Sequence, residues 1–399
     1  MKQRRPTRSA ITLAVLLAVG CDLPPGAAEI SSPDASLRSS SSAVTQQPTV
    51  CDPAPPPKIT IGPFEGCQPW NCGSNGAWLG GNIIFHELDA HGVWANSRGV
   101  KILSFQDRHG IPLTLDIVGD QLVAIQRDGT VLPDPPMDGW VLNLTVGSTP
   151  GTPGTLYDLI ITKDSPDTTP FWVASSISHA SAPVYLFNYK PHNSDCPLRS
   201  LCQPTTDPET ISFSGRALIF TADRYDADRK TVKLPNQPDD GNALWFNIAC
   251  AGTTIAKMHL LRHTVAGSAP TTPPRIERRQ AVLKMLAADY CGTGSPLFTR
   301  DGHPLQYSFS PPTWANVRPP PPPPPVRSLD AIWNENGAVC LNAARLEDES
   351  ADIRVPIDHE CEISRHAVLK PCPASVRYDS PSSWSPLGYA ISANEFPPR

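Results

Sequence analysis

Proline is the residue that most restricts the fold of this chain. It occurs 47 times in 399 residues, more than twice its average frequency of about 5%. Because proline removes a backbone donor and breaks helix interiors, this count excludes a helical bundle or a coiled coil. Apolar residues make up 40% of the chain, which is below the usual share of about 45–50%. The sequence therefore predicts a body of short strands joined by turns.

The first 20 residues have the features of an export signal. A basic start precedes an apolar stretch, residues 10–20, that is too short to span a bilayer. The stretch ends in Leu17-Ala18-Val19-Gly20-Cys21, which resembles the lipobox of bacterial lipoproteins. We expect residues 1–20 to be removed and Cys21 to carry lipid, which would anchor the protein in the cell envelope. The outer membrane or cell surface is favoured over the inner membrane. The alternative is an ordinary signal peptide in which Cys21 is incidental.

The charge of the chain limits its partners. The formal net charge is −5. Loss of four basic residues with the signal would change it to −9; these are Lys2, Arg4, Arg5 and Arg8. A nucleic-acid binder would instead carry a basic stripe. The chain also has no run of about 20 apolar residues that could span a membrane. We therefore expect the lipid to supply the attachment to the membrane, and the remaining partner to be an envelope protein or a polysaccharide.

An even number of cysteines remains once Cys21 is set aside. In an exported chain such a set predicts disulfides, although their connectivity does not follow from sequence. Two pairs are close in sequence, Cys67 with Cys72 and Cys196 with Cys202. Zinc held by these pairs is a weaker alternative, because their spacings are looser than those of zinc ribbons. The disulfide candidates are Cys51, Cys67, Cys72, Cys196, Cys202, Cys250, Cys291, Cys340, Cys361 and Cys372.

Composition divides the chain into segments. Residues 21–60 are rich in Ser, Pro and Ala, which predicts a flexible tether with Cys51 pinning its end to the body. We assign residues 61–210 to an N-terminal β-rich domain and residues 211–399 to a second domain. Within the second domain, the seven prolines 319–325 predict a stiff polyproline excursion. A ligand for an aromatic groove is the less favoured interpretation of these prolines.

Alternation and turn signals predict the strands of a β-sandwich or a barrel-like body. One helix is expected over about 275–290, with Thr272 as its N-cap and Gly292 as its stop. Ala331–Leu346 is expected to form a hairpin around Asn336-Gly337. The expected strands are Val100–Phe105, Leu113–Val118, Leu122–Gln126, Val141–Val146, Leu156–Thr162, Val184–Tyr189, Ala217–Thr221, Thr231–Leu234, Leu244–Cys250 and Ala256–Leu261.

The end of the expected helix reads Ala288-Asp289-Tyr290-Cys291-Gly292. This segment resembles the signature of the bacterial ADYC-domain proteins. The segments 243–257 and 332–340 are also similar to the family, as is the block from Cys67 to Asp89. The resemblance implies an exported, cysteine-rich protein that is often a lipoprotein. It implies no established activity, and it transfers no catalytic residue.

The signature residues have a structural and a functional interpretation. Asp289 can accept backbone N–H bonds in a turn, and Tyr290 can pack while its hydroxyl finds a partner. We favour a disulfide anchor at Cys291, covered by Tyr290. The resemblance also implies two cysteines that this chain replaces with Met258 and Val282. If they stand in for a bridge, the two side chains should lie in contact.

Three further groups suggest chemistry, but each has a simpler explanation. His86 and His91 are five residues apart, whereas a zincin helix needs a spacing of four. A group of aspartates could line a calcium site, but solvated turns are the default. Tryptophans could form a carbohydrate platform, but they are more often core. The aspartates are Asp223, Asp226, Asp228, Asp239 and Asp240, and the tryptophans include Trp70, Trp78 and Trp94.

The sequence therefore predicts an exported, lipid-anchored envelope or surface protein that serves as a binding or structural module. We expect no catalytic residue, no metal and no cofactor. The alternative function is a lipid-anchored hydrolase acting on envelope polymers. Convergent carboxylates in one cleft would favour that enzyme.

Overall fold

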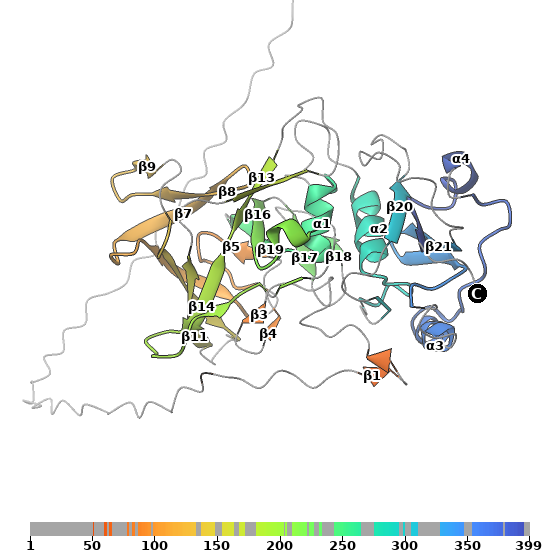
Figure 1. Ribbon diagram of the computed structural model, residues 1–399, viewed down its shortest axis with the longest axis horizontal. Helices are drawn as coiled ribbons and strands as arrows, with labels where there is room; N and C mark the ends of the chain where they lie inside the picture. Colours follow the sequence, from red (N-terminus) through yellow and green to blue (C-terminus); the bar gives the residue numbers. More distant parts are fainter. Residues whose placement is uncertain are drawn as a thin grey trace, which may run out of the picture. The chain divides into compact units, whose positions relative to one another are not determined.

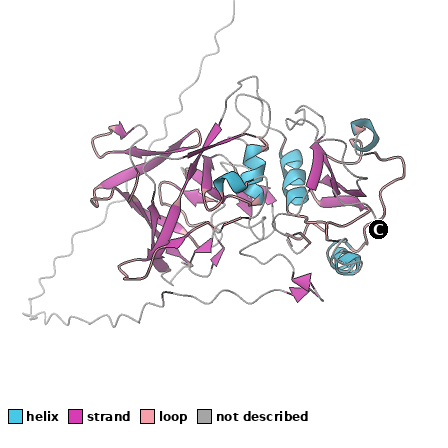
Figure 2. Ribbon diagram, in the orientation of Figure 1, coloured by secondary structure: helices cyan, strands magenta, loops and turns pink. Residues whose placement is uncertain are grey.

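A computed structural model describes the protein (Figure 1). The expected signal 1–20, Cys21, Cys67 and Cys72, most of the tether 21–60 and the proline run 319–325 lie outside the described residues. The described residues form mostly strands, with a few short helices (Figure 2). The structure describes residues 51, 60–61, 64–65, 78–79, 82–83, 87–96, 99–132, 137–147, 154–162, 167–171, 181–202, 204–205, 210–221, 223–226, 231–233, 243–264, 275–294, 298–299, 305–309, 328–346, 353–377 and 380–394.

The largest sheet has eight strands in the order β15-β14-β11-β10-β6-β7-β8-β9. Its pairs are antiparallel, and buried side chains alternate along several of its strands, as in Val141–Val146, where Leu142, Leu144 and Val146 are buried. This period-2 pattern places one face of the sheet on a core. Its strands are β6 Lys101–Gln106, β7 Pro112–Val118, β8 Gln121–Ile125, β9 Val131–Leu132, β10 Val141–Val146, β11 Thr155–Ile161, β14 Phe187–Pro191 and β15 Arg199–Ser200.

A five-stranded sheet with the order β12-β13-β16-β19-β5 is buried on both faces. Leu218 and Phe220 face one core, while Ala217 and Ile219 face the other. Such strands have near-continuous apolar runs, as ALIF does in β16. The sheet joins strands from both sides of residue 210, the expected domain boundary. Its strands are β5 Leu88–Asp89, β12 Asp167–Pro170, β13 Ser181–Tyr185, β16 Ala217–Thr221 and β19 Trp245–Cys250.

The third large sheet has four strands and lies in the C-terminal part of the chain. Its order is β20-β23-β21-β22, so the strand latest in the sequence lies between two earlier ones. Its strands are β20 Leu305–Phe309, β21 Ser328–Asn334, β22 Gly337–Leu341 and β23 Ala390–Asn394. The described residues also contain the strand pairs β1 Thr60–Ile61 with β2 Phe64–Glu65, β3 Trp78–Leu79 with β4 Asn82–Ile83, and β17 Arg224–Asp226 with β18 Thr231–Lys233.

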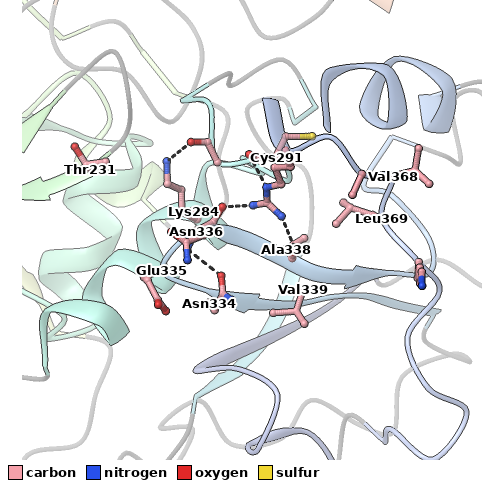
Figure 3. Close-up of a pocket in the computed structure, with 14 residues that line it drawn as sticks. Thr231, Lys284, Cys291, Asn334, Glu335, Asn336, Ala338, Val339, Val368 and Leu369 are labelled. Atoms are coloured by element: carbon pink, nitrogen blue, oxygen red, sulfur yellow. Dashed lines mark hydrogen bonds between the residues drawn. The ribbon is translucent and has the colours of Figure 1, made fainter. Parts of the chain in front are cut away.

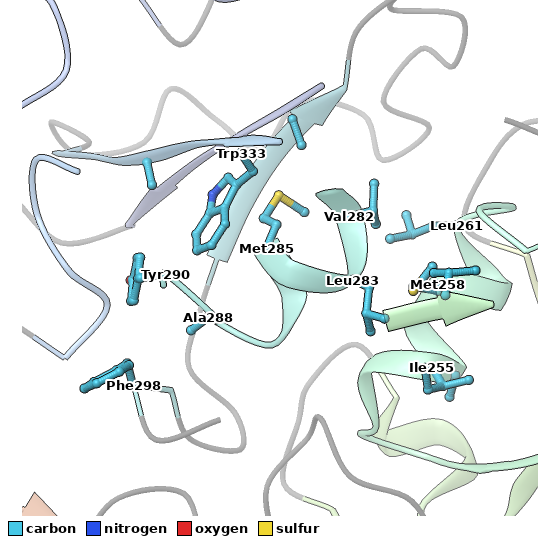
Figure 4. Packing of buried hydrophobic residues seen from close by; sticks show 14 of the residues in the cluster. Ile255, Met258, Leu261, Val282, Leu283, Met285, Ala288, Tyr290, Phe298 and Trp333 are labelled. Carbon is cyan, nitrogen blue, oxygen red and sulfur yellow. The ribbon is translucent and has the colours of Figure 1, made fainter. Parts of the chain in front are cut away.

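Two hydrophobic cores lie on opposite faces of the five-stranded sheet. One core fills the space between this sheet and the eight-stranded sheet, as in a sandwich. The other packs the sheet against helices and against Ala331 and Trp333 of the four-stranded sheet (Figure 4). The helices are α1 Thr254–Leu260, α2 Ile276–Leu286, α3 Arg354–Arg365 and α4 Pro381–Trp384, with a 3-10 turn at Ile211–Phe213. The prediction of a mainly β, disulfide-stapled body is confirmed.

Two of the predicted elements are wrong in type or length. Ala256–Leu261 was expected as a strand but belongs to α1, because Thr253 accepts the Ala256 N–H and caps a helix there. The expected helix over about 275–290 ends at Leu286, four residues early. Its N-cap position is Arg275, which makes no side-chain cap bond; Thr272 lies outside the described residues.

One predicted strand is interrupted, one predicted turn is shifted by a residue, and two helices were not expected. Val184–Tyr189 is interrupted at Leu186, where the chain leaves the five-stranded sheet and enters the eight-stranded one. The hairpin turns at Glu335 and Asn336, since Asn334 pairs directly with Gly337. Helices α3 and α4 were not predicted. The buried residues Ile353, Ile357 and Cys361 recur every four positions, and this spacing could have indicated α3.

The described residues contain four disulfides, and all of them join distant parts of the chain. Cys51 pairs with Cys196, which ties the expected end of the tether to the loop after β14. Cys202 pairs with Cys250, so Cys196 and Cys202, although close in sequence, take separate distant partners. The other two pairs are Cys291–Cys361 and Cys340–Cys372. Such bonds form in oxidising compartments and indicate an extracellular or periplasmic protein.

Candidate binding pocket beside the signature

Ala288 ends helix α2. Its φ is +52°, a left-handed conformation that glycine usually supplies at this position. The N–H of Ala288 bonds to the carbonyl of Met285 (3.1 Å), and the N–H of Asp289 bonds to that of Lys284 (2.9 Å). These two bonds form a Schellman motif, which satisfies carbonyls left free at a helix end. The signature therefore begins with the turn that stops the helix.

Asp289 forms a buried ion pair with Lys284. The Lys284 ammonium lies 2.5 Å from Oδ2 of Asp289, and both side chains are buried. The same oxygen accepts the backbone N–H of Gly294 at 2.9 Å. Because a buried charge is stable only when it is paired and hydrogen-bonded, Asp289 fixes the path of the loop that follows the helix.

Tyr290 connects the signature to the four-stranded sheet. Its ring stacks on Trp333 with 5.1 Å between centroids. Its hydroxyl donates to Oδ1 of Asp330 (2.8 Å) and accepts the backbone N–H of Arg345 (3.0 Å). Burial, followed by the charge of Asp330, raises the pKa of Tyr290 well above its ordinary value. The phenol therefore remains a neutral donor.

Asp330 is the acceptor at the centre of this buried network. Its Oδ2 accepts from Ser392 Oγ at 2.7 Å and from Arg345 Nε at 3.2 Å. Burial raises the pKa of Asp330, while Arg345 and the hydrogen bonds oppose that rise. Arg345 also donates to the carbonyls of Met285 and Leu286. The network thus joins the end of α2 to strands β21 and β23.

Cys291 completes the signature with a disulfide to Cys361 of α3. Beside this bond, the guanidinium of Arg365 donates to three backbone carbonyls. They belong to Cys291 (2.8 Å), Ala338 (2.8 Å) and Asn336. Arg365 therefore holds together the signature loop, the β21–β22 hairpin and the end of α3.

Gly292 and Gly337 permit this close approach. Both have positive φ, +71° and +116°. A Cβ at Gly292 would collide with the carbonyl oxygen of Asn336, and one at Gly337 would collide with Arg365 and lie 2.7 Å from the Tyr290 carbonyl oxygen. Only glycine fits these positions without displacing the hairpin from the signature loop.

A pocket of about 660 Å³ opens where these segments meet (Figure 3). Its lining combines cations, one carboxylate and apolar side chains. Glu335 is the acidic side chain among the described lining residues. The described lining residues are Thr231, Lys284, Cys291, Gly292, Asn334, Glu335, Asn336, Ala338, Val339, Arg365, Ala367, Val368, Leu369 and Lys370.

The aspartates considered for calcium do not come together in the described structure. Asp223 is buried and forms an ion pair with Arg279, and it accepts the Tyr225 hydroxyl at 3.2 Å. Asp226 lies half-buried on β17. Asp228, Asp239 and Asp240 lie outside the described residues. In the part of the chain that is described, no group of three or more His, Cys, Asp or Glu side chains is placed to hold a metal.

The segment around the two histidines is held by buried carboxylates. His86 lies outside the described residues, whereas Glu87 is buried against Arg224 at 2.9 Å. The Asp89 carboxylate accepts four backbone N–H groups at 2.8–3.1 Å, from His91, Val93, Trp94 and Leu244. Asp89 thereby fixes the loop that exposes Trp94.

Of the three tryptophans considered as a platform, the structure describes the side chain of Trp94 alone. Its side chain is 45% exposed. Trp70 lies outside the described residues, and Trp78 is described only as part of the backbone of β3.

Met258 and Val282 are both fully buried in the same core. Met258 lies on α1 rather than on a strand, and Val282 lies on α2 (Figure 4). Both residues therefore belong to the helical layer between the five-stranded and four-stranded sheets.

Sequence reasoning missed four of the residues that build this region. They are Lys284, Asp330, Arg345 and Arg365. Lys284 has its partner nearby in the sequence but inside the core, whereas the other three contact residues far away in the sequence. A signal existed for one of them. Lys284 lies one helical turn from Ala281 and Ala287, on a small apolar face where a charge requires a buried partner.

Comparison with known proteins identifies a family for the part of the chain that holds these features. Neither the curated proteins nor the solved structures yield a significant match. The described residues contain no helix that is both long and apolar enough to cross a bilayer. The family model of the ADYC domain matches residues 148–347, which is half of the chain and includes the signature, the five-stranded sheet from β12 to β19 and the β21–β22 hairpin. The chain therefore belongs to the ADYC domain family.

Proposed function

We propose that the protein is an exported lipoprotein, attached to the cell envelope through Cys21, and that its β-rich body is a binding module. The features of residues 1–21 support the anchor. The four disulfides support a compartment outside the cytoplasm. The unknown ligand is an envelope protein or polysaccharide.

The pocket beside the signature is the observation that carries the binding role. Its walls are held in place by the Cys291–Cys361 disulfide and by the three carbonyl bonds of Arg365. Two apolar side chains at its rim, Val339 and Val368, are 37% and 51% exposed. A pre-formed concave surface with apolar contacts and a few fixed polar groups is typical of ligand sites.

The alternative hydrolase requires a catalytic pair in such a pocket. A glycosidase, for example, uses two carboxylates that flank the scissile bond. The described lining residues include one carboxylate, Glu335. The nearby Asp289 and Asp330 do not line the pocket and are engaged with Lys284 and Arg345. The observations therefore support binding better than hydrolysis.

Membrane attachment is tested by replacing Cys21. The Cys21→Ser protein should move from the membrane fraction to the soluble fraction after cell lysis, because the acyl chains supply the attachment. The unchanged protein and a Cys51→Ser variant serve as controls and should remain with the membrane. A Cys21→Ser protein that stays membrane-bound would show that the proposed anchor is wrong.

The binding role is tested by photocrosslinking in intact cells. A photoreactive amino acid in place of Val368 should give a discrete adduct with an envelope component. The same amino acid in place of Val118, which is 60% exposed at the end of β7, should not. Equal adducts at both positions, or none at Val368, would contradict a binding role for this pocket.

A further inference from the structure

Arg365 brings a positive charge to the pocket without an ion-pair partner among the described residues. A guanidinium has five N–H donors, and three of them go to the carbonyls of Cys291, Ala338 and Asn336. Carbonyl oxygens satisfy hydrogen bonds but do not neutralise the charge. Burial lowers the pKa of Arg365, and Asp289 partly opposes this effect. The charge is thus held partly buried in the pocket wall, with donors to spare.

The rest of the pocket sets the character of a complementary ligand. Lys370 adds an exposed cation on the same lining, and Glu335 adds one carboxylate. Lys284 contributes little net charge because it is paired with Asp289. Val339 and Val368 supply exposed apolar surface. The complementary ligand therefore carries an anionic group next to an apolar group.

A peptide fits this combination better than a sugar polymer. Sugar rings are commonly bound on aromatic side chains, whereas the described lining residues offer valine, alanine and leucine. The exposed amide of Asn336 can exchange hydrogen bonds with a peptide group. The volume of about 660 Å³ lies within the range of known ligand pockets, about 300–1,000 Å³.

We propose that this pocket binds an acidic peptide segment of another envelope protein, with its carboxylate toward Arg365 and Lys370 and a neighbouring apolar side chain on Val339 and Val368. The inference rests on the proposed binding function and names its ligand class. Arg365 therefore has two roles, since it also joins three segments of the fold.

The test uses the detergent-solubilised full-length protein and a labelled peptide, acetyl-Val-Glu-Val-Glu-Val-amide. Fluorescence anisotropy should show saturable binding that weakens as salt increases, because the attraction is electrostatic. The matched peptide with Gln in place of Glu should bind about tenfold more weakly, since it lacks the charge. Equal binding of the two peptides would overturn the proposal.

Variants at the rim test the site without disturbing Arg365. Lys370→Glu should weaken binding of the Glu peptide several-fold, and Glu335→Gln should strengthen it, because the changes are opposite in charge. Arg127→Glu, an exposed control in the turn after β8, should leave affinity unchanged. Circular dichroism and thermal melting confirm that each variant is folded. Rim variants that bind like the unchanged protein would overturn the assignment to this pocket.

Two outcomes separate this inference from the proposed function. A discrete crosslink at Val368 without binding of the Glu peptide would overturn the peptide ligand but leave the binding role intact. A pocket that instead binds polygalacturonate, and releases it in the Lys370→Glu variant, would also overturn the peptide ligand. Failure of both the crosslink and the peptide would remove the proposed function as well.

Discussion

The hydroxyl of Tyr290 lies 2.8 Å from Oδ1 of Asp330, although 40 residues separate the two and both side chains are fully buried. This bond is the point at which the signature reaches the four-stranded sheet. The other carboxylate oxygen of Asp330, Oδ2, accepts from Arg345 and Ser392. Removal of one group therefore affects the hydrogen bonding of the others.

Replacement of Tyr290 by Phe should destabilise the protein by about 1–3 kcal/mol. The change leaves Asp330 and the Arg345 N–H each short of one buried partner, which costs more than the loss of an exposed hydrogen bond. Urea denaturation measures the difference. The matched control is Tyr157→Phe on β11. Tyr157 is also buried, and its ring makes an edge-to-face contact with Tyr189. This change should cost less than half as much stability. Similar losses of stability in both variants would mean that the hydrogen bonds of the Tyr290 hydroxyl do not stabilise the fold more than an ordinary buried tyrosine does.

Replacement of Gly292 by Ala should cost more than the same change at Gly147. The two glycines have nearly equal φ, +71° and +74°. A new Cβ at Gly292 would meet the carbonyl of Asn336, whereas one at Gly147 would meet nothing within 4 Å. The left-handed backbone costs both variants about 1 kcal/mol, so the difference between their melting temperatures reports the packing of the hairpin on the signature. Equal melting temperatures would contradict that packing.

The pair Met258→Cys and Val282→Cys should form a disulfide during oxidative refolding. Both side chains are fully buried in one core on helices α1 and α2, and a bridge needs Cα atoms within about 7 Å. The oxidised double variant should melt at a higher temperature than its reduced form. Each single variant should leave one free thiol and lose stability through poorer packing. Two free thiols in the folded, oxidised double variant would show that the helices are too far apart.

Stability should fall as the pH drops below about 6.5 because of His263. This side chain is fully buried, and burial, together with the charges of Arg278 and Arg279, holds its pKa well below the ordinary value of 6.5. Below this pH the unfolded chain binds a proton at His263 that the folded chain does not bind. The free energy of unfolding therefore falls by up to about 1.4 kcal/mol per pH unit. The His263→Phe variant should lose less stability between pH 7 and pH 5 than the unchanged protein. The exposed control His109→Gln should keep the original pH dependence, and an unchanged slope in His263→Phe would contradict this origin.

Local patterns predicted the local parts of the fold. The alternation in Val141–Val146 and the apolar run in Ala217–Thr221 led directly to β10 and β16. The strand predicted at Ala256–Leu261 was wrong because an apolar run does not distinguish a buried helix from a strand, and the capping bond of Thr253 decides between them. The helix ending at Leu286 was also mispredicted, because Ala288 adopts a conformation that sequence rules reserve for glycine.

Contacts between distant residues were beyond the reach of the sequence. Cys202 follows β15 of the eight-stranded sheet, whereas Cys250 ends β19 of the five-stranded sheet. Their disulfide therefore depends on how the two sheets pack, and no spacing encodes it. Arg365 has no sequence motif, yet it joins three segments through backbone carbonyls, which every residue possesses. The pocket could not be predicted for the same reason, since its lining comes from separate segments of the chain, at Thr231, at 284–292, at 334–339 and at 365–370.

The central place of β23 in its sheet has a consequence for the time course of folding. Strands β20 and β21 both pair with residues 390–394 and not with each other, so the sheet cannot close while the chain is still emerging from an exporter. Cys291 and Cys340 must likewise wait for Cys361 and Cys372. During that interval both thiols and two unpaired strand edges are exposed, which favours misoxidation and aggregation. A stop codon just before Ala390 would therefore leave β20 and β21 without their shared partner strand, although both are synthesised well before residue 390.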